Sequence, residues 1–208
     1  MHADGPLVVT APHGTGKTEL VIRRFCWLVE SKVAWAPEVA IVTFSRKAAA
    51  EMRERLQLRL EEDIERMPVM TIHGLARSVL AMQAAARQET LHIVDPSQSF
   101  RLVKQAMTEC RLSETVWPPS MVYDLISSSR ERGITAQNFM TVPDSPSQQR
   151  LAIVYGQYEA LLADKKGYDF PGLILSARQL LEANYDLLEE LQMRFRFMMV
   201  DEWQDGAP

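Results

Sequence analysis

The sequence predicts an α/β fold, in which helices cover both faces of a parallel sheet and an all-helical segment is inserted. Two observations carry this prediction. Short apolar runs alternate with amphipathic helical patterns over residues 1–95, which is the order that parallel strands and their crossover helices require. Strand-like runs then vanish over residues 96–166 and return only near the end of the chain.

Each of the first four candidate strands is followed by a helical pattern. The strands are expected at Pro6–Ala11, Val39–Phe44, Met67–Ile72 and Leu91–Val94. The helices are expected at about Lys17–Ser31, Arg46–Leu60, Leu75–Ala86 and Ser97–Thr108. The first helix is amphipathic, and its expected buried face consists of Leu20, Val21, Phe25, Leu28 and Val29.

The middle of the chain reads as helices joined by Pro- and Ser-rich connections, Trp117–Ser120 and Pro143–Ser147. Its helical patterns are Ser97–Thr108, Met121–Arg132 and Gln149–Lys165. Two more helices and a strand follow, at Pro171–Ala183, Tyr185–Arg194 and Phe195–Val200. We therefore expect an α/β domain in two parts, 1–95 and 167–208, with a helical insertion at 96–166.

The composition excludes several classes of protein. Hydrophobic residues make up 47% and charged residues 24% of the 208, which is typical of a globular chain and not of a disordered or fibrous one. No apolar run approaches the roughly 18 residues of a membrane helix, and the first residues do not resemble a signal peptide. The two cysteines, Cys26 and Cys110, fit reduced core thiols in a cytoplasmic protein. The net charge of −4 means that nucleic-acid binding would need a local patch.

The segment Ala11–Thr18 fits the phosphate-binding pattern G-x-x-x-x-G-K-[ST], with alanine in the first position. Glycines allow successive backbone N–H groups to turn toward phosphate oxygens, and the helix that follows adds its positive N-terminus. Lys17 is expected to reach the β and γ phosphates of ATP, and the Thr18 hydroxyl is expected to bind Mg²⁺. A structural glycine turn is the alternative. The expected nucleotide-binding residues are His13, Gly14, Thr15, Gly16, Lys17 and Thr18.

An acidic pair, Asp201 and Glu202, follows the apolar run Phe197–Val200. Ligands of parallel sheets gather at the carboxyl ends of the strands, so Asp201 is expected to share one Mg²⁺ with Thr18. Glu202 is then placed to activate an attacking water. Two solvated acids at a strand end are the alternative.

Five segments in order resemble motifs of the UvrD/Rep/PcrA group of superfamily-one DNA helicases. They are Thr15–Thr18 (TGKT), Thr43–Met52 (TFSRKAAAEM), Thr71–Gly74 (TIHG), Tyr168–Leu173 (YDFPGL) and Val200–Asp205 (VDEWQD). The resemblance implies a RecA-like P-loop domain 1A with subdomain 1B inserted at 96–166. It also implies an ATP-dependent enzyme that translocates on single-stranded DNA and unwinds duplex at a junction, and it makes Gln204 a link between the γ-phosphate and the neighbouring lobe.

The segment around Ser45 suits the binding of a single strand without sequence preference. Ser45 can cap the helix that begins at Arg46, Lys47 adds positive charge there, and the Phe44 ring can stack on a base. The alternative is an Ala-rich surface helix with Phe44 in the core. The resemblance adds Thr71 and His73 as DNA contacts, whereas Asp169 and Phe170 could equally start and anchor the returning helix.

The sequence also departs from the helicase pattern. Only Met1–Gly5 precede the first expected strand, so we expect the adenine-reading segment to be missing, and Glu19 stands where related helicases often have a basic residue. The second lobe and its arginine fingers are expected to lie beyond Pro208. The resemblance therefore implies that this chain alone neither unwinds DNA nor hydrolyses ATP at a useful rate.

Two other functions remain open from the residues. A small-molecule P-loop kinase would need arginines over the phosphates, which Arg130, Arg132 and Arg150 could supply. A non-catalytic module that binds DNA or a protein could keep the phosphate loop as a relic.

Overall fold

The computed structural model describes residues 5–12, 14–60, 67–139 and 146–206. The chain forms two compact units. Unit 1 consists of residues 1–72 and 189–207, and unit 2 consists of residues 73–188. The expected boundaries at 95/96 and 166/167 both fall inside unit 2, and the division into domains 1A and 1B stays a prediction.

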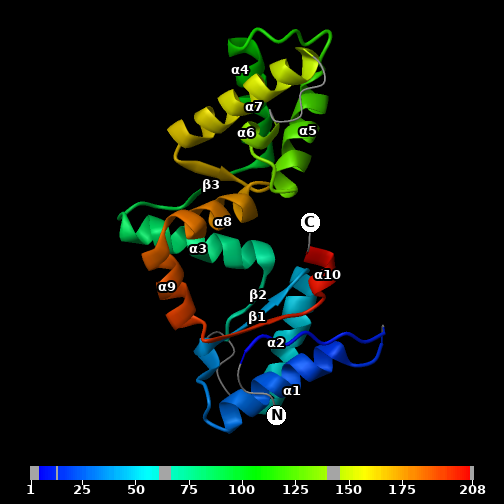
Figure 1. Cartoon of the computed structure of the whole chain (residues 1–208), viewed down its shortest axis with the longest axis vertical. Coiled ribbons are helices and arrows are strands. Elements are labelled where there is room, and N and C mark those ends of the chain that lie inside the picture. Colours follow the sequence, from blue (N-terminus) through cyan, green and yellow to red (C-terminus); the bar gives the residue numbers. More distant parts are fainter. Residues whose placement is uncertain (1–4, 13, 61–66, 140–145, 207–208) are drawn as a thin grey trace. The chain divides into compact units, whose positions relative to one another are not determined.

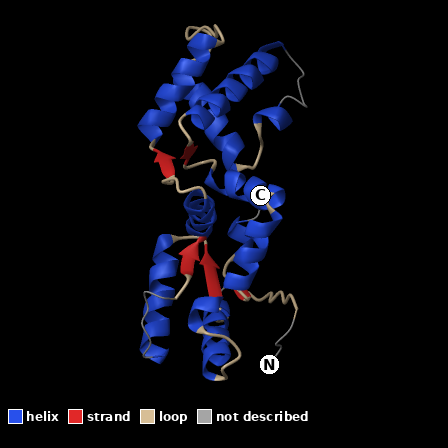
Figure 2. Cartoon of the chain, turned by 90° about the vertical axis from the view of Figure 1, so that its left-hand side faces the viewer, coloured by secondary structure: helices blue, strands red, loops and turns tan. Residues whose placement is uncertain are grey.

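Unit 1 is built on a three-stranded parallel sheet, in the order β2-β1-β5 (Figure 1). Figure 2 shows the strands in red and the helices in blue. The strands are β1 (Val39–Thr43), β2 (Val69–Thr71) and β5 (Phe197–Val200). In this register Ile41 of β1 pairs with Val69 on one side and Met199 on the other. The long helices are α1 (Lys17–Glu30) and α2 (Arg46–Leu60), and the short ones are η1 (Ala36–Glu38) and α10 (Trp203–Gly206). Helix α2 therefore follows strand β1, as the sequence predicts.

The core of unit 1 lies between one face of this sheet and the helices α1 and α2. Every residue of β1 is buried, because β1 has a strand on each side. Residues of β5 instead alternate between half-buried and exposed positions. The outward-facing Met198 and Val200 are 46% and 38% exposed. Helices therefore do not cover both faces of the sheet along its whole width. On α1, Ile22 is fully buried and Leu20 is 43% exposed, so the expected position of Leu20 on the buried face is wrong.

The strand expected at Pro6–Ala11 is absent from the described residues. Residues 6–11 form an exposed loop, in which Leu7 and Val8 are 66% and 85% exposed. A β-branched run forms a strand only when its N–H and C=O groups find a neighbouring edge. None of the described strands pairs with this run.

Unit 2 consists of helices around a two-stranded parallel sheet. Helices α4, α5 and α7 enclose a core that includes Val103, Met107, Ile126, Val154 and Tyr155. The helices of this part of the chain are α4 (Pro96–Glu109), α5 (Pro119–Glu131), α6 (Ala136–Phe139), α7 (Pro146–Asp164) and α8 (Leu173–Ala183). Helix α3 (Ile72–Ala86) leads into unit 2, and α9 (Tyr185–Arg194) leads out of it. The helices expected in this region are confirmed to within about three residues at each end.

The small sheet corrects one expectation. Strand β3 (His92–Val94) does not join the sheet of unit 1 but pairs with β4 (Gly167–Asp169), which the sequence did not predict. Gly167 makes this pairing possible, because a Cβ atom there would lie 2.7 Å from Cγ2 of Val94. A three-residue strand with a glycine and an aspartate has too weak a pattern to be recognised alone.

Both cysteines are free, and burial raises the pKa of each thiol. No helix within the described residues is long and apolar enough to span a membrane.

Candidate functional site

The Gly-rich segment that the sequence predicts to bind phosphate lies directly before α1. Gly14 and Gly16 have φ angles of 77° and 90°, in the left-handed region that favours glycine. Gly16 is the N-cap of α1, and among the described residues no side chain caps the N–H groups of this helix end. Those groups are therefore suited to an anion. His13, the fourth residue before Lys17, lies outside the described residues.

Side chains of the loop bind its own carbonyl groups. Nζ of Lys17 lies 3.2 Å from the carbonyl oxygen of Ala11 and 3.3 Å from that of Pro12. The Thr15 hydroxyl donates to the same Pro12 carbonyl at 2.7 Å. The Lys17 ammonium group thus lies over the loop itself.

The acidic pair lies at the carboxyl end of β5, and Asp201 faces α1. The backbone N–H of Asp201 donates to the carbonyl of Val42 at 2.9 Å, which extends the pairing of β5 with β1 by one residue. The carboxylate is 7% exposed, and its Oδ2 accepts a hydrogen bond of 2.9 Å from the Thr18 hydroxyl. Two residues that are 183 positions apart in the sequence therefore meet at one point.

Glu202 has a φ angle of 52°, a left-handed conformation that is uncommon for a residue with a side chain. Its carboxylate accepts a hydrogen bond from Nε2 of Gln204. Strained residues of this kind cluster at functional sites. Gln204 thus holds the side chain that the sequence marks as a catalytic base.

A magnesium ion would find suitable oxygen ligands at Thr18 and Asp201. Mg²⁺ prefers a few protein oxygens and completes its shell with water and substrate phosphates. Within the described residues no group of three or more His, Cys, Asp or Glu side chains could hold a metal. The Thr18–Asp201 pair offers two oxygen ligands to a metal that completes its shell with water and phosphate oxygens.

Glu19, the departure noted in the sequence, forms ion pairs with two arginines. One carboxylate oxygen, Oε1, accepts from Nε of Arg23 and from Nη2 of Arg59, each at 2.8 Å. Arg23 and then Arg59 lower the pKa of Glu19 by hydrogen bonding to its charged form. Arg59 belongs to the last turn of α2, and the sequence analysis did not identify it.

The beginning of α2 is the place where the sequence predicts a single-strand contact. Oγ of Ser45 accepts a hydrogen bond of 3.1 Å from the backbone N–H of Ala48, so Ser45 caps the helix as expected. Arg46 and Lys47 are exposed, and Phe44 is 57% exposed. The alternative that placed Phe44 in the core is wrong.

The two other expected DNA contacts lie in different units. Thr71 ends β2 in unit 1 and is half-buried. His73 belongs to unit 2, where its ring stacks on Phe170 with centroids 4.6 Å apart and planes 3° from parallel. Phe170 is 44% exposed.

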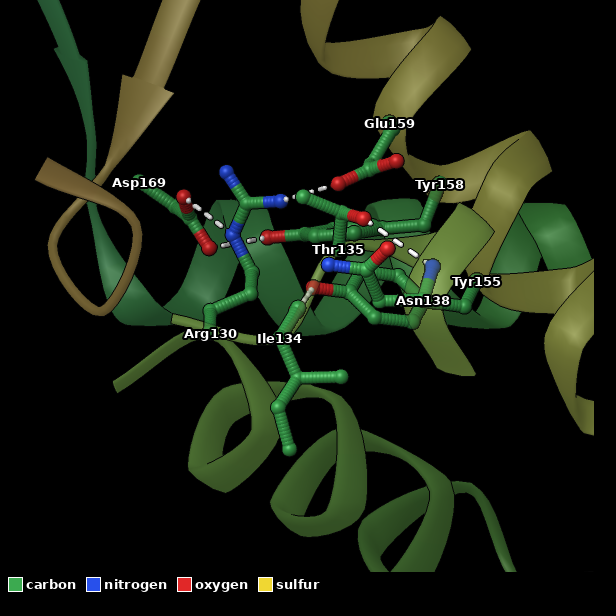
Figure 3. A network of polar contacts seen from close by, with 8 residues as sticks. All are labelled: Arg130, Ile134, Thr135, Asn138, Tyr155, Tyr158, Glu159 and Asp169. Atoms are coloured by element: carbon green, nitrogen blue, oxygen red, sulfur yellow. Dashed lines mark hydrogen bonds and ion pairs between the residues drawn. The ribbon is translucent and has the colours of Figure 1, made fainter. Parts of the chain in front are cut away.

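Asp169 anchors a buried ion-pair network in unit 2 rather than a site at the surface (Figure 3). Its Oδ1 accepts from Nε of Arg130 at 2.9 Å, and its Oδ2 accepts from the Tyr158 hydroxyl at 2.9 Å. Arg130 also contacts Glu159 at 3.0 Å. Arg130 and Asp169 are only 6% and 2% exposed, so Arg130 is committed to this network and does not form a lid over a nucleotide.

The whole chain, residues 1–208, matches the UvrD/REP helicase N-terminal domain family. It is 31% identical over 205 residues to "ATP-dependent DNA helicase PcrA" of Leuconostoc citreum, covering 97% of this chain and 27% of that protein. It is 28% identical over 204 residues to the PcrA helicase of Staphylococcus aureus, covering 97% and 28%. It is 32% identical over 203 residues to "DNA helicase II" of Escherichia coli strain K12, covering 96% and 28%. The chain thus spans just over a quarter of the length of these relatives.

Proposed function

Because the chain belongs to the UvrD/REP helicase N-terminal domain family, we propose that it is the ATP-binding lobe of a DNA-dependent ATPase. The whole enzyme translocates on single-stranded DNA and unwinds duplex DNA in the cytoplasm. Unwinding is assigned to the whole enzyme and not to this lobe, because translocation needs two lobes that close and open around ATP. Residues 96–166 are assigned to the inserted subdomain 1B.

The hydrogen bond between Thr18 and Asp201 is the observation that carries this proposal. It joins the end of the Gly-rich loop to the end of the acidic strand. Nucleotides bind to α/β sheets at the carboxyl ends of parallel strands, where Asp201 lies, and Thr18 contacts Asp201 from the first turn of α1. A structural glycine turn and a solvated acid pair do not require these two side chains to meet.

Each residue of the site has a role in binding or hydrolysis. The N–H groups of the loop and the start of α1 hold the phosphates, and Lys17 adds a positive charge to them. Thr18 and Asp201 would hold Mg²⁺, which would supply positive charge to the phosphates. Glu202 accepts the proton of the attacking water, and Gln204 orients the Glu202 carboxylate.

The exposed start of α2 is assigned to the single strand. Backbone phosphates lie near Arg46, Lys47 and the helix N-terminus, and a base stacks on Phe44. Thr71 and His73 complete the proposed DNA contacts.

Replacement of Lys17 by alanine tests the nucleotide site. We expect the affinity for a fluorescent ATP analogue with Mg²⁺ to fall by at least about 100-fold, because the variant loses the charge that binds the β and γ phosphates. Equilibrium fluorescence anisotropy measures this change, and circular dichroism confirms that both proteins are folded.

The matched control is Lys104→Ala, which removes an exposed lysine from α4 in unit 2 and should leave the affinity unchanged. Equal affinity of the wild-type chain and Lys17→Ala for the ATP analogue would contradict the assignment of this loop to nucleotide phosphates. It would favour a non-catalytic DNA- or protein-binding module.

Replacement of Phe44 by alanine tests the DNA side. We expect binding of oligo-dT to weaken by about 5- to 150-fold, since stacking of one base on an aromatic ring contributes roughly 1–3 kcal/mol. Anisotropy of labelled oligo-dT measures the loss, and a steep decrease of affinity with salt should accompany it. Trp35→Ala removes a comparably exposed ring of unit 1 and serves as the control. Unchanged oligo-dT binding by Phe44→Ala would contradict the assignment of this helix start to DNA.

A further inference from the structure

Glu19 places a negative charge at the edge of the phosphate loop. It is the second residue after Lys17, in the first turn of α1. A Cβ atom built on Gly16 of the loop would lie 3.9 Å from Cβ of Glu19, so the side chain begins in contact distance of the loop. A carboxylate free to turn toward the loop would repel the phosphates of a nucleotide.

Two arginines bind this carboxylate. Arg23 lies one turn further along α1, and Arg59 reaches across from the end of α2. Both donate to the same oxygen of Glu19, and the side chain of Glu19 is 31% exposed. Arg59 is the partner from outside α1, so it determines that the carboxylate points toward α2.

We propose that Arg59 is a positioning residue of the nucleotide site: through Glu19, it neutralises and holds a carboxylate that would otherwise oppose the triphosphate. This inference rests on the proposed function, because it requires a nucleotide on the loop. It also gives a reason for an acid directly after Thr18, where a lone carboxylate would weaken phosphate binding. Arg59 acts through Glu19 and does not itself touch the phosphates.

The test compares Arg59→Met with the double variant Glu19→Gln/Arg59→Met. A negative charge about 10 Å from a triphosphate weakens its binding by roughly three- to tenfold at physiological salt. We expect Arg59→Met to lose at least about threefold in affinity for the fluorescent ATP analogue with Mg²⁺, and to lose less for the ADP analogue. The double variant should return to within about twofold of the wild type, because the opposing charge is gone.

The control is Arg55→Met, which breaks the exposed ion pair between Arg55 and Glu51 on the same helix. It removes the same charge from α2 and should not change nucleotide affinity. The difference between Arg59→Met and the wild type should also shrink in 1 M salt, where charges are screened over about 3 Å. A purely structural role of Arg59 would give neither the rescue nor the salt effect.

Three results overturn the inference, and they can be distinguished. The role of Arg59 alone is rejected if Lys17-dependent binding is equally strong in the wild type and in Arg59→Met. It is also rejected if the double variant binds as weakly as Arg59→Met. Absence of Lys17-dependent binding in the wild type rejects the proposed nucleotide site and this role with it.

Discussion

Replacement of Arg130 by methionine should destabilise unit 2 by about 3–5 kcal/mol, because it leaves the 2% exposed carboxylate of Asp169 without its ion-pair partner. Glu159 loses its contact with Arg130 at the same time. Methionine keeps the length and much of the apolar volume of the arginine stem, so the loss of stability reports on the missing charge. Hydrogen exchange resolved by peptide measures this loss of stability. We expect α4, α5 and α7 to exchange faster in Arg130→Met than in the wild type.

Two further variants separate the buried charge from a general effect of losing an arginine. Arg178→Met removes an arginine of α8 whose side chain is 64% exposed, and it should change stability by less than about 0.5 kcal/mol. Arg130→Met/Asp169→Asn should regain about half of the loss, because the amide oxygen can still accept from Tyr158 while the buried charge is removed. Unchanged exchange in Arg130→Met would show that the network contributes little to stability.

Replacement of Gly172 by alanine should have an effect of similar size in the same network. A Cβ atom at this position would lie 2.2 Å from Nη2 and 2.5 Å from Nε of Arg130, and 2.5 Å from Oδ1 of Asp169. Atoms cannot approach this closely, so the ion pair or the backbone before α8 must move. We expect a loss of at least about 3 kcal/mol, since overpacking is here combined with disruption of a buried ion pair.

Gly156 of α7 offers the matched control. A Cβ atom there would meet only Cβ of Ala136, at an ordinary 4.0 Å, so Gly156→Ala should be neutral or stabilise the helix by up to about 1 kcal/mol. The two glycines should therefore respond with opposite signs in a urea titration followed by circular dichroism. The cost of Gly172→Ala should also shrink when Arg130 is already methionine, since the clash with the guanidinium is then removed. Equal responses of the two glycines would refute the close-approach argument.

The sequence by itself predicted the elements whose signals are local. Helices α1–α5 and α7–α9 follow from apolar spacing over one or two dozen residues, whereas the four-residue α6 was not predicted. The glycines of the loop before Lys17 follow from the need for left-handed backbone. The Ser45 cap is equally local, because a cap and the N–H group it binds are three residues apart. The acidic pair after Val200 was also recognisable, since an apolar run ends there abruptly.

Only the tertiary structure decided which distant segments pair. It joined β3 to β4 in a sheet of their own, left residues 6–11 without a strand partner, and turned Glu19 toward Arg59. The buried Arg130–Asp169 pair belongs to the same class, because 39 residues separate its members. Strand partners and ion pairs depend on groups far apart in the chain, whereas helical periodicity and capping depend on neighbouring residues. A single sequence therefore specifies helices and caps much more directly than it specifies strand partners and ion pairs.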